Sequence, residues 1–545
     1  MKEFELISTN PIGEPRETNG RVARPLRIFE VALTTKFSHE FYPLQLFVLA
    51  GALERSQPKL HEMTLVRAGK AENIIDYVKN NNPDILAISA PQGTLETLDA
   101  VLGALAQFEA EKLPKIILGH SLPSFLPERF LKKHQGLPIT IVTGWGEDAF
   151  AKEVMAASYG DNFSSPKILF GTYPESYPYQ GNIPQKGTVF FHYPRVETSK
   201  GCFWGACSYC LRTGDEKPGK WKRFEPEDVL KQISELIRYG YTEYFEFADE
   251  EPLGNDIYPF QTVVDGLIEI KNAHPELTFG LNMRADHVIS PDQQKQKLYD
   301  AFLERAKRAG LSVVWMGAES YSHSQLKKYN KGPAITPYTN LEAARKIHDL
   351  GINVLQGFIP YHPLADWEEL TEMANFMTNN MDLLSEVLAS PFGFLRVQYH
   401  TPYEEAVRRT EKDSRRKLLG ELNENMLTYD CKYLDPSIGL HVAYMRLIYD
   451  WINPFMKEIS VDVITDTNGE NKTKLKELRR AGLELFLQSI KKLYPLRDNR
   501  QQLKETQQEI IDQYKRKINN FGINIGSLED FMREKERDYL EKYVG

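Results

Sequence analysis

Residues 196–210 read Val-Glu-Thr-Ser-Lys-Gly-Cys-Phe-Trp-Gly-Ala-Cys-Ser-Tyr-Cys and hold three of the four cysteines of this 545-residue chain. Cys202, Cys207 and Cys210 follow an expected strand, in a loop where their thiolates can converge on one centre. A structural zinc site needs a fourth cysteine or histidine, and Cys431 lies far away in sequence. Three thiolates suit an iron–sulfur cluster that leaves one iron open to a substrate or cofactor.

Beyond this loop, short apolar strands alternate with amphipathic helices up to residue 402. Six such units predict a full or partial βα barrel over residues 188–402. Active sites of βα barrels lie at the carboxyl ends of the strands, and the cysteine loop follows the first of them. The expected strands are Val196–Ser199, Tyr244–Ala248, Thr278–Asn282, Ser312–Gly317, Asn353–Ile359 and Phe394–His400.

On the N-terminal side of the loop, a second series of strands and helices runs over residues 27–165. Its strands are nearly continuous apolar runs, which predicts a doubly wound parallel sheet covered by helices on both faces. A ligand of such a sheet binds at the carboxyl ends of the strands. The expected strands are Arg27–Thr35, Glu62–Arg67, Asp84–Ala90, Lys115–Gly119 and Thr140–Gly144.

Three further segments complete the domain organisation. Residues 1–26 are expected to form an N-terminal extension, and residues 166–187, rich in proline and glycine, a linker. From residue 403 to 545 the strand pattern fades into charged amphipathic helices. The predicted fold class is therefore α/β, with a parallel-sheet domain, a central βα barrel and a mainly helical C-terminal domain.

The composition narrows the class of protein. Hydrophobic residues make up 41% and charged residues 26% of the chain, as in ordinary globular proteins. The net charge of −8 provides no overall basic field for nucleic acid. The N-terminus lacks the apolar core of a signal peptide, and the longest purely apolar run, Leu46–Leu53, is too short to span a bilayer. We expect a cytoplasmic protein with no membrane span and no nucleic-acid partner.

The cysteine loop resembles the cluster loop of radical S-adenosylmethionine (SAM) enzymes, and residues 27–165 resemble the cobalamin-binding domain that many of them carry. The commonest spacing in that family is C-x3-C-x2-C, whereas this loop has C-x4-C-x2-C. The extra residue changes the path of the loop but not the number of ligands. The resemblance implies a 4Fe–4S cluster on Cys202, Cys207 and Cys210, with SAM and cobalamin as further cofactors.

Three later segments are similar to SAM-facing elements of that family: Phe247–Pro252, Trp315–Ser320 and Asn353–Pro360. For Glu319, the alternative is a strand-end carboxylate paired with a lysine or arginine, and for Asp249–Glu251 it is a solvated acidic turn. By this resemblance the residues that bind SAM are Phe203, Trp204, Tyr209, Asp249, Glu250, Glu319, Ser320 and Gln356.

The motif Asp-x-His-x-x-Gly, whose histidine ligates cobalt in many cobalamin proteins, does not occur in the chain. The radical SAM branch commonly lacks it, and three loops here resemble the cobalamin-contact loops of that branch. Gly-Trp-Gly-Glu at 144–147 replaces the more usual Gly-Glu-Gly-Glu. A sheet that binds another nucleotide-like ligand is the alternative. The expected cobalamin contacts are Ser89, Pro91, Gln92, Gly93, Gly119, His120, Gly144, Trp145, Gly146 and Glu147.

The resemblance implies an oxygen-sensitive enzyme that methylates an unactivated carbon of a metabolite or natural-product precursor. One SAM would methylate cob(I)alamin to methylcobalamin, and a second would yield a 5′-deoxyadenosyl radical. The alternatives are a cobalamin-assisted cyclisation, ring contraction or oxidation without methyl transfer, and a non-catalytic cobalamin or redox sensor. Expected partners are a small-molecule or peptide substrate and an electron donor such as flavodoxin or ferredoxin. The substrate and the catalytic residues are not readable from the sequence.

Overall fold

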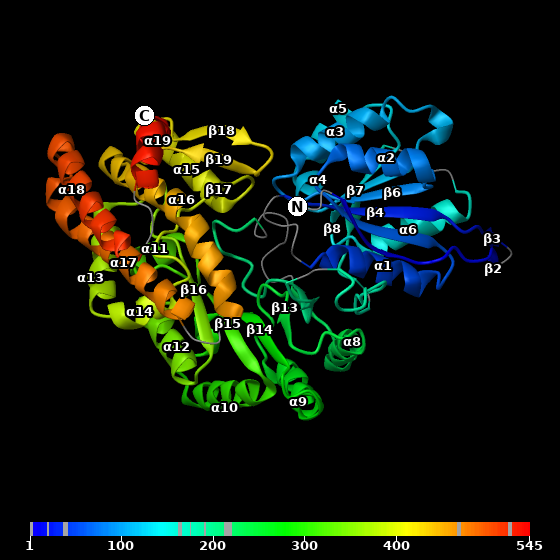
Figure 1. Cartoon of the computed structure of the whole chain (residues 1–545), viewed down its shortest axis with the longest axis horizontal. Coiled ribbons are helices and arrows are strands. Elements are labelled where there is room, and N and C mark those ends of the chain that lie inside the picture. Colours follow the sequence, from blue (N-terminus) through cyan, green and yellow to red (C-terminus); the bar gives the residue numbers. More distant parts are fainter. Residues whose placement is uncertain are drawn as a thin grey trace.

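The computed structural model describes residues 4–18, 21–35, 42–161, 166–174, 176–189, 192–211, 221–465, 470–521 and 526–544. Figure 1 shows an N-terminal sheet domain, a central domain of parallel strands and helices, and a C-terminal region of long helices. No helix among the described residues is both long and apolar enough to cross a membrane.

The N-terminal domain is built on a seven-stranded sheet in the order β1-β5-β4-β6-β7-β8-β9. The strand β1 pairs antiparallel and the other strands pair parallel, so the predicted doubly wound sheet is confirmed. The strands are β1 (Phe4–Thr9), β4 (Arg27–Leu33), β5 (Glu62–Ala68), β6 (Ile85–Ser89), β7 (Lys115–Gly119), β8 (Ile139–Gly144) and β9 (Lys167–Gly171).

Helices cover both faces of this sheet, which is why its strands are apolar on both sides. The helices α1 (Leu44–Ser56) and α6 (Glu147–Ser158) pack on the face toward the central domain (Figure 1). The opposite face carries α2 (Ala71–Asn81), α3 (Leu95–Leu105), α4 (Ser121–Phe125) and α5 (Pro127–Lys133). The short elements β2 (Arg16–Thr18), β3 (Arg21–Ala23) and η1 (Ala110–Lys112) complete the domain.

Two strands of this sheet come from segments expected to lie outside it. The strand β1 belongs to the range 1–26, and β9 to the range 166–187. Both are edge strands of the sheet, where one neighbour suffices, so a short partly buried segment can join without the strong apolar signal of a central strand. The extension and the first part of the linker therefore contribute to the N-terminal fold.

The central domain has an open five-stranded parallel sheet in the order β10-β13-β14-β15-β16, which is a partial barrel. Its strands are β10 (Arg195–Val196), β13 (Tyr244–Phe247), β14 (Thr278–Met283), β15 (Leu311–Glu319) and β16 (Asn353–Phe358). Its helical elements are α8 (Pro226–Arg238), α9 (Tyr258–Ala273), η2 (Ala285–His287), α10 (Gln293–Ala309), α11 (His323–Lys328), α12 (Pro337–Asp349), α13 (Trp367–Thr378) and α14 (Met381–Val387).

Two of the six expected barrel strands differ in the structure. The first ends at Val196, and Ser199 begins a separate hairpin of β11 (Ser199–Gly201) and β12 (Trp221–Arg223). The range Phe394–His400 does not form a sixth barrel strand. Phe394 makes only an isolated parallel bridge with Tyr361, and β17 (Val397–Gln398) pairs antiparallel with β19 (Thr428–Cys431). An alternating pattern shows that a segment is a strand but not which sheet it joins.

The C-terminal region is mainly helical, as predicted, and also carries a small antiparallel sheet in the order β17-β19-β18. Its elements after β17 are α15 (Pro402–Ser414), β18 (Leu419–Asn423), β19 (Thr428–Cys431), α16 (Pro436–Thr465), α17 (Glu470–Leu493), η3 (Tyr494–Leu496), α18 (Arg500–Asn519) and α19 (Gly526–Tyr543). The β18–β19 hairpin extends toward the N-terminal sheet domain in Figure 1.

The tip of this hairpin is bonded to the N-terminal domain. The backbone carbonyl of Asn425 accepts from Gly93 N–H at 2.7 Å, and its side-chain oxygen accepts from Leu95 N–H at 2.9 Å at the start of α3. Glu424 pairs with Arg129 at 2.7 Å. The hairpin therefore caps α3 and fixes the loop that follows β6.

Two helical glycines give a matched test of the packing around α1. A Cβ on Gly51 would lie 1.7 Å from the Tyr179 carbonyl oxygen, whereas a Cβ on Gly103 in α3 meets nothing within 4 Å. We expect Gly51→Ala to destabilise the protein by about 1–3 kcal/mol, because backbone must move. Gly103→Ala should stabilise it by about 0.5–1 kcal/mol. Thermal unfolding of the two variants measures this, and a Gly51→Ala protein as stable as Gly103→Ala would contradict it.

Candidate functional site

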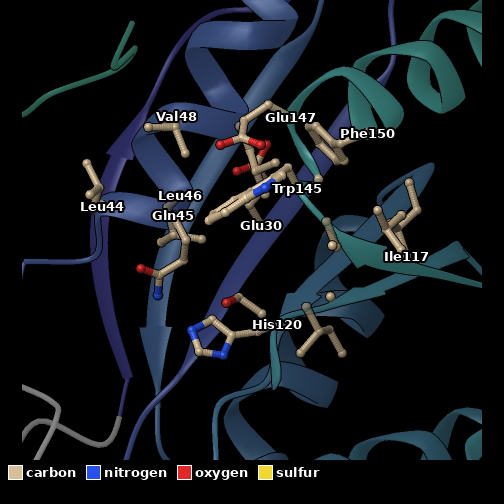
Figure 2. Close-up of a pocket in the computed structure, with 18 of the residues that line it drawn as sticks. Glu30, Leu44, Gln45, Leu46, Val48, Ile117, His120, Trp145, Glu147 and Phe150 are labelled. Atoms are coloured by element: carbon tan, nitrogen blue, oxygen red, sulfur yellow. The ribbon is translucent and has the colours of Figure 1, made fainter. Parts of the chain in front are cut away.

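A cavity of about 330 Å³ lies between the N-terminal sheet and helices α1 and α6, at the carboxyl ends of the strands (Figure 2). It extends across the β4–β6 boundary, where the strand order β5-β4-β6-β7 reverses direction, the expected place for a ligand of a doubly wound sheet. The central domain contributes Arg195, Glu197, Lys200 and Ala248 to its wall. The cavity therefore lies at the junction of the two domains.

Several polar atoms in this cavity lack protein partners. Both carboxyl oxygens of Glu30, the hydroxyl of Ser89 and one carboxyl oxygen of Glu147 are buried, and no described residue hydrogen-bonds to them. Buried polar groups in native proteins are normally paired, so unpaired ones on a cavity wall indicate that a ligand pairs with them. The cavity thus fits a ligand that carries both apolar surface and hydrogen-bonding groups, as cobalamin does.

A buried ion cluster joins the two domains beside the cavity. The ammonium of Lys200, which is 4% exposed, lies 2.7 Å from Glu147 of α6 and 2.7 Å from Glu197. It also lies 4.9 Å from the centre of the Trp145 ring. Burial lowers the pKa of Lys200, but Glu197 and Glu147 outweigh this effect and raise the pKa overall, so the lysine stays charged.

Most of the expected cobalamin contacts line this cavity. They are Ser89, Gly119, His120, Gly144, Trp145, Gly146 and Glu147. His120 has a φ of 78° and its Nδ1 accepts from Ser121 N–H at 2.8 Å, so it caps α4. Pro91, Gln92 and Gly93 do not line the cavity and lie in the loop held by the hairpin tip.

The cavity is also lined by four residues that were not predicted from the sequence: Glu30, Arg195, Glu197 and Lys200. Glu30 carries a readable signal, because it is the one acid inside the otherwise apolar run Ile28–Leu33. Lys200 lies two residues before Cys202 and belongs to no motif of its own. The partner of Lys200 on α6 is more than fifty positions earlier, and no local pattern connects the two.

The cysteine loop is fixed on the turn that follows α11. Trp204 Nε1 donates to the Asn330 carbonyl at 2.7 Å, and Asn330 Nδ2 donates to the Ala206 carbonyl at 2.7 Å. Ser208 N–H donates to the Tyr329 carbonyl at 3.0 Å. These bonds hold the loop through its backbone and the Trp204 side chain.

The three cysteines of the loop are each partly exposed. Burial raises the pKa of Cys202, and the backbone N–H groups of Trp204 and Gly205 oppose the rise. Among the described residues, no three His, Cys, Asp or Glu side chains are grouped to hold a single metal ion. In a 4Fe–4S cluster each cysteine binds a different iron, so the thiols of such a site need not meet at one point. The donor set of three thiols therefore fits the cluster.

Glu319 lies next to the cysteine loop, at the end of β15. Its carboxylate is 3.5 Å from Lys331 and is hydrogen-bonded by Tyr209. A Cβ on Gly317 would be 2.7 Å from this carboxylate, and one on Gly357 3.1 Å, so the two glycines make room for it. Glu319 also has a φ of 63°, a strained value for a residue other than glycine. Strain of this kind is concentrated at functional sites.

Three other expected SAM contacts point elsewhere. Gln356 is 0% exposed, and its amide donates to the Asn340 carbonyl at 2.8 Å and accepts from the Tyr321 hydroxyl. Ser320 is buried and accepts from Ser322 N–H at 3.0 Å. The carboxylate of Asp249 accepts from Thr198 and Ser199, and burial raises its pKa to about 7. The structure does not bring these three side chains to the site.

The remaining predicted residues lie around the loop. The Phe203 ring centre is 6.4 Å from that of His287, which pairs with buried Glu251 at 3.0 Å. The Trp204 ring lies under the guanidinium of Arg284 at 5.1 Å. Glu250 is exposed on the turn after β13. Phe203, Trp204, Tyr209 and Glu319 are therefore the predicted residues that the structure places beside the cysteines.

A doubly wound sheet with a cavity at its strand ends, joined to a partial βα barrel with a three-cysteine loop, is the arrangement expected of a radical SAM enzyme with a corrinoid-binding domain. Residues 196–377 match the radical SAM superfamily, and residues 30–153 match the B12 binding domain. The chain therefore carries a radical SAM domain and a B12 binding domain, and these two domains imply a 4Fe–4S cluster, SAM and cobalamin as cofactors.

Among curated proteins, 4′-phospho-dehydrooxetanocin synthase of Priestia megaterium is 26% identical over 395 residues, which are 65% of this chain and 50% of that protein. The chain thus spans about half the length of this relative. The structure of OxsB with aqua-cobalamin and SAM bound is similar over 95% of this chain and 84% of that one, with a TM-score of 0.76 and 20% identity. The methyltransferase TsrM from Kitasatospora setae is similar over 72% of this chain and 78% of that one, with a TM-score of 0.54 and 15% identity.

Replacement of any one of Cys202, Cys207 or Cys210 by alanine should abolish the cluster. We expect loss of bound iron and sulfide and of SAM cleavage in anaerobically reconstituted protein, because a cluster needs all three thiolates. Cys431→Ala is the matched control, since Cys431 is buried elsewhere, against Tyr403 and Leu419. It should keep full iron content. Formation of 5′-deoxyadenosine by a loop-cysteine variant would refute the assignment of the ligands.

Glu319 can be tested with two substitutions that separate binding from folding. Glu319→Gln removes the charge, and we expect SAM to bind about tenfold more weakly. Glu319→Gly also relieves the positive φ, which is worth about 1 kcal/mol, so this variant should be no less stable than the wild type and still bind SAM weakly. Equilibrium dialysis with SAM and thermal unfolding measure the two properties. Wild-type SAM affinity in Glu319→Gly would rule out the role.

Proposed function

We propose that the chain carries out a radical oxidation or rearrangement of a small molecule without net methyl transfer. The observation that carries this proposal is the similarity to the structure of OxsB. That similarity covers 95% of the chain, so it includes the C-terminal helices. The sequence relative with 26% identity is, by its name, a synthase of a dehydro product and not a methyltransferase. Methyl transfer, the reaction expected from the sequence, is therefore placed second.

The residues of this chain would divide the work between two domains. When bound, the cluster supplies the electron that cleaves SAM, and cobalamin adds its own redox and alkyl-transfer chemistry. Glu319, held by Lys331 and Tyr209, would orient the polar end of SAM next to the cysteine loop. Lys200 and Glu147 hold the cavity against the end of β13, where Ala248 forms part of its wall. Both cofactors would therefore face the same end of the barrel.

Methyl transfer to an unactivated carbon remains the second candidate. It is supported by the similarity to TsrM, whose described function is that of a radical SAM methyltransferase and whose structure holds tryptophan as substrate. That similarity covers 72% of this chain, less than the similarity to OxsB. The sensor alternative is disfavoured, because a sensor needs no SAM site and the arrangement of Glu319, Tyr209 and Lys331 beside the cysteines suits SAM.

The two reactions leave different SAM products. Reconstituted protein with cobalamin, a chemical reductant and a low-molecular-weight bacterial extract should convert methyl-deuterated SAM to 5′-deoxyadenosine, without S-adenosylhomocysteine and without label in any product. Mass spectrometry detects 5′-deoxyadenosine, S-adenosylhomocysteine and any deuterium-labelled product, and the Cys207→Ala protein is the control. S-adenosylhomocysteine together with a labelled methyl group in a product would overturn the proposal in favour of methyl transfer. Failure to cleave SAM at all would favour the sensor.

A further inference from the structure

Glu30 occupies an unusual position in the N-terminal sheet. The register places Glu30 of β4, Ala87 of β6, Ile117 of β7 and Thr140 of β8 in one row across the sheet. Strand neighbours of Glu30 on the same face, such as Ile28, belong to the apolar core packed against α1 and α6. A carboxyl group in such a row costs folding free energy unless something pairs with it.

No described residue pairs with Glu30. The side chain is 0% exposed, and neither carboxyl oxygen is hydrogen-bonded to any residue of the described segments. Burial raises its pKa to about 8, so the carboxyl is mostly protonated at neutral pH. A protonated carboxyl has one O–H donor and a free acceptor oxygen. The group is therefore an uncharged donor that faces the cavity (Figure 2).

The surroundings of Glu30 define what it can bind. The wall near it is largely apolar and includes Leu46, Leu49, Ile117, Val142 and Phe150. Its volume of about 330 Å³ is at the small end of the range for ligand pockets, roughly 300–1,000 Å³, and holds one part of a cobalamin molecule and not the whole. The amide-fringed corrin ring does not suit such walls. The flat benzimidazole base at the end of the nucleotide tail does, and it carries one ring nitrogen that can accept a hydrogen bond.

We propose that Glu30 donates a hydrogen bond to the free ring nitrogen of the benzimidazole base of cobalamin and thereby selects corrinoids with a nitrogen-containing base. A nitrogen that accepts this bond is not bound to cobalt, so cobalamin would bind with its base detached from the metal. The proposal depends on cobalamin binding and is independent of whether the reaction transfers a methyl group.

The first test measures corrinoid affinity in the full-length, cluster-reconstituted protein. We expect Glu30→Leu to bind cobalamin about tenfold more weakly than the wild type, because the hydrogen bond is lost. Glu30→Gln keeps an uncharged N–H donor and should bind within about twofold of the wild type. Thr140→Val is the matched control: Thr140 lies in the same row, is also buried and unpaired among the described residues, and does not line the cavity. Its affinity should be unchanged.

The second test compares cobalamin with a cobamide whose lower base is a phenol and has no ring nitrogen. The wild type should prefer cobalamin about tenfold, and Glu30→Leu should bind both equally, because the effect of the residue depends on the nitrogen. If Glu30→Leu lowered the affinity for both corrinoids by the same factor, the role of Glu30 would be structural and the proposal would be overturned. Equal affinity of the wild type for the two corrinoids would also overturn the proposal. This comparison needs no variant, so it holds even if Glu30→Leu fails to fold.

Protein without cobalamin separates binding from folding. Glu30→Leu replaces an unpaired buried carboxyl with an apolar side chain, so the cobalamin-free variant should unfold at the same or a higher temperature than the wild type. Lower stability together with unchanged cobalamin affinity would overturn the proposal. If the wild type bound cobalamin but Glu30→Leu did so equally well, only the role of Glu30 would fail, and the assignment of the enzyme class would be untouched.

The proton on Glu30 also predicts a pH dependence. The donor is present below about pH 8 and is lost as the pH rises through the pKa of Glu30, so cobalamin affinity should fall above pH 8 by about tenfold in all, toward the affinity of Glu30→Leu. Glu30→Gln should lack this fall. The comparison of the two proteins cancels the titration of the other ionisable groups that line the cavity, which are Tyr42, His120, Glu147, Arg195, Glu197 and Lys200. The same pH dependence in Glu30→Gln would assign it to one of them and refute the proposal.

Discussion

The ion cluster around Lys200 connects the two halves of the enzyme. Lys200 belongs to the segment that leads into the cysteine loop, and Glu147 begins α6 of the sheet domain. Both side chains are about 5% exposed or less, and loss of one partner from a buried pair costs about 3–5 kcal/mol. Because Glu197 supplies a second carboxylate, the charge of the buried lysine is fully compensated. The cavity and the cysteine loop are thus joined through neighbouring residues of one short segment.

Asp249 explains why that segment leaves the sheet where it does. Its carboxylate accepts from the Thr198 backbone N–H and hydroxyl and from the Ser199 hydroxyl, so a side chain takes the bonds that a neighbouring strand would otherwise receive. The strand β10 therefore ends at Val196, and β11 starts a separate hairpin. This early exit places Glu197 and Lys200 at the domain junction and the cysteines beyond it. An acid expected to face SAM instead shapes the entry to the cluster loop.

The sequence predicted what depends on local pattern and missed what depends on tertiary pairing. The strand β7 was found at its observed bounds, Lys115–Gly119, because a continuous apolar run between loops has few other interpretations. The range Phe394–His400 was misassigned, because its partner β19 lies some thirty residues further along and the alternation of a strand does not identify its neighbour. The cluster loop was predicted from the clustering of three cysteines after an expected strand and from its resemblance to the loop of radical SAM enzymes.

Candidate site residues divide in the same way. Glu319 was selected by its motif, and the structure places it beside the cysteine loop with a strained backbone. Gln356 was selected by the same kind of match, yet its side-chain amide is hydrogen-bonded in the core to Tyr321 and Asn340. A motif gives the position of a residue along a strand. Which groups its side chain contacts depends on the surrounding fold. Glu30 was missed because a single acid in an apolar strand belongs to no motif.

The C-terminal region is part of the cobalamin side of the enzyme as well as of the barrel. Asn425 at the hairpin tip bonds to Gly93 and Leu95, and Leu427 is buried in the core of the sheet domain. The loop after β6 is thereby fixed by a segment more than three hundred residues later in the chain. A change in the C-terminal region that shifted this hairpin would move the cobalamin-side loop with it. The C-terminal hairpin and the loop after β6 are therefore mechanically coupled in this fold, and the region that carries the coupling, β17 to β19, is the one the sequence did not predict.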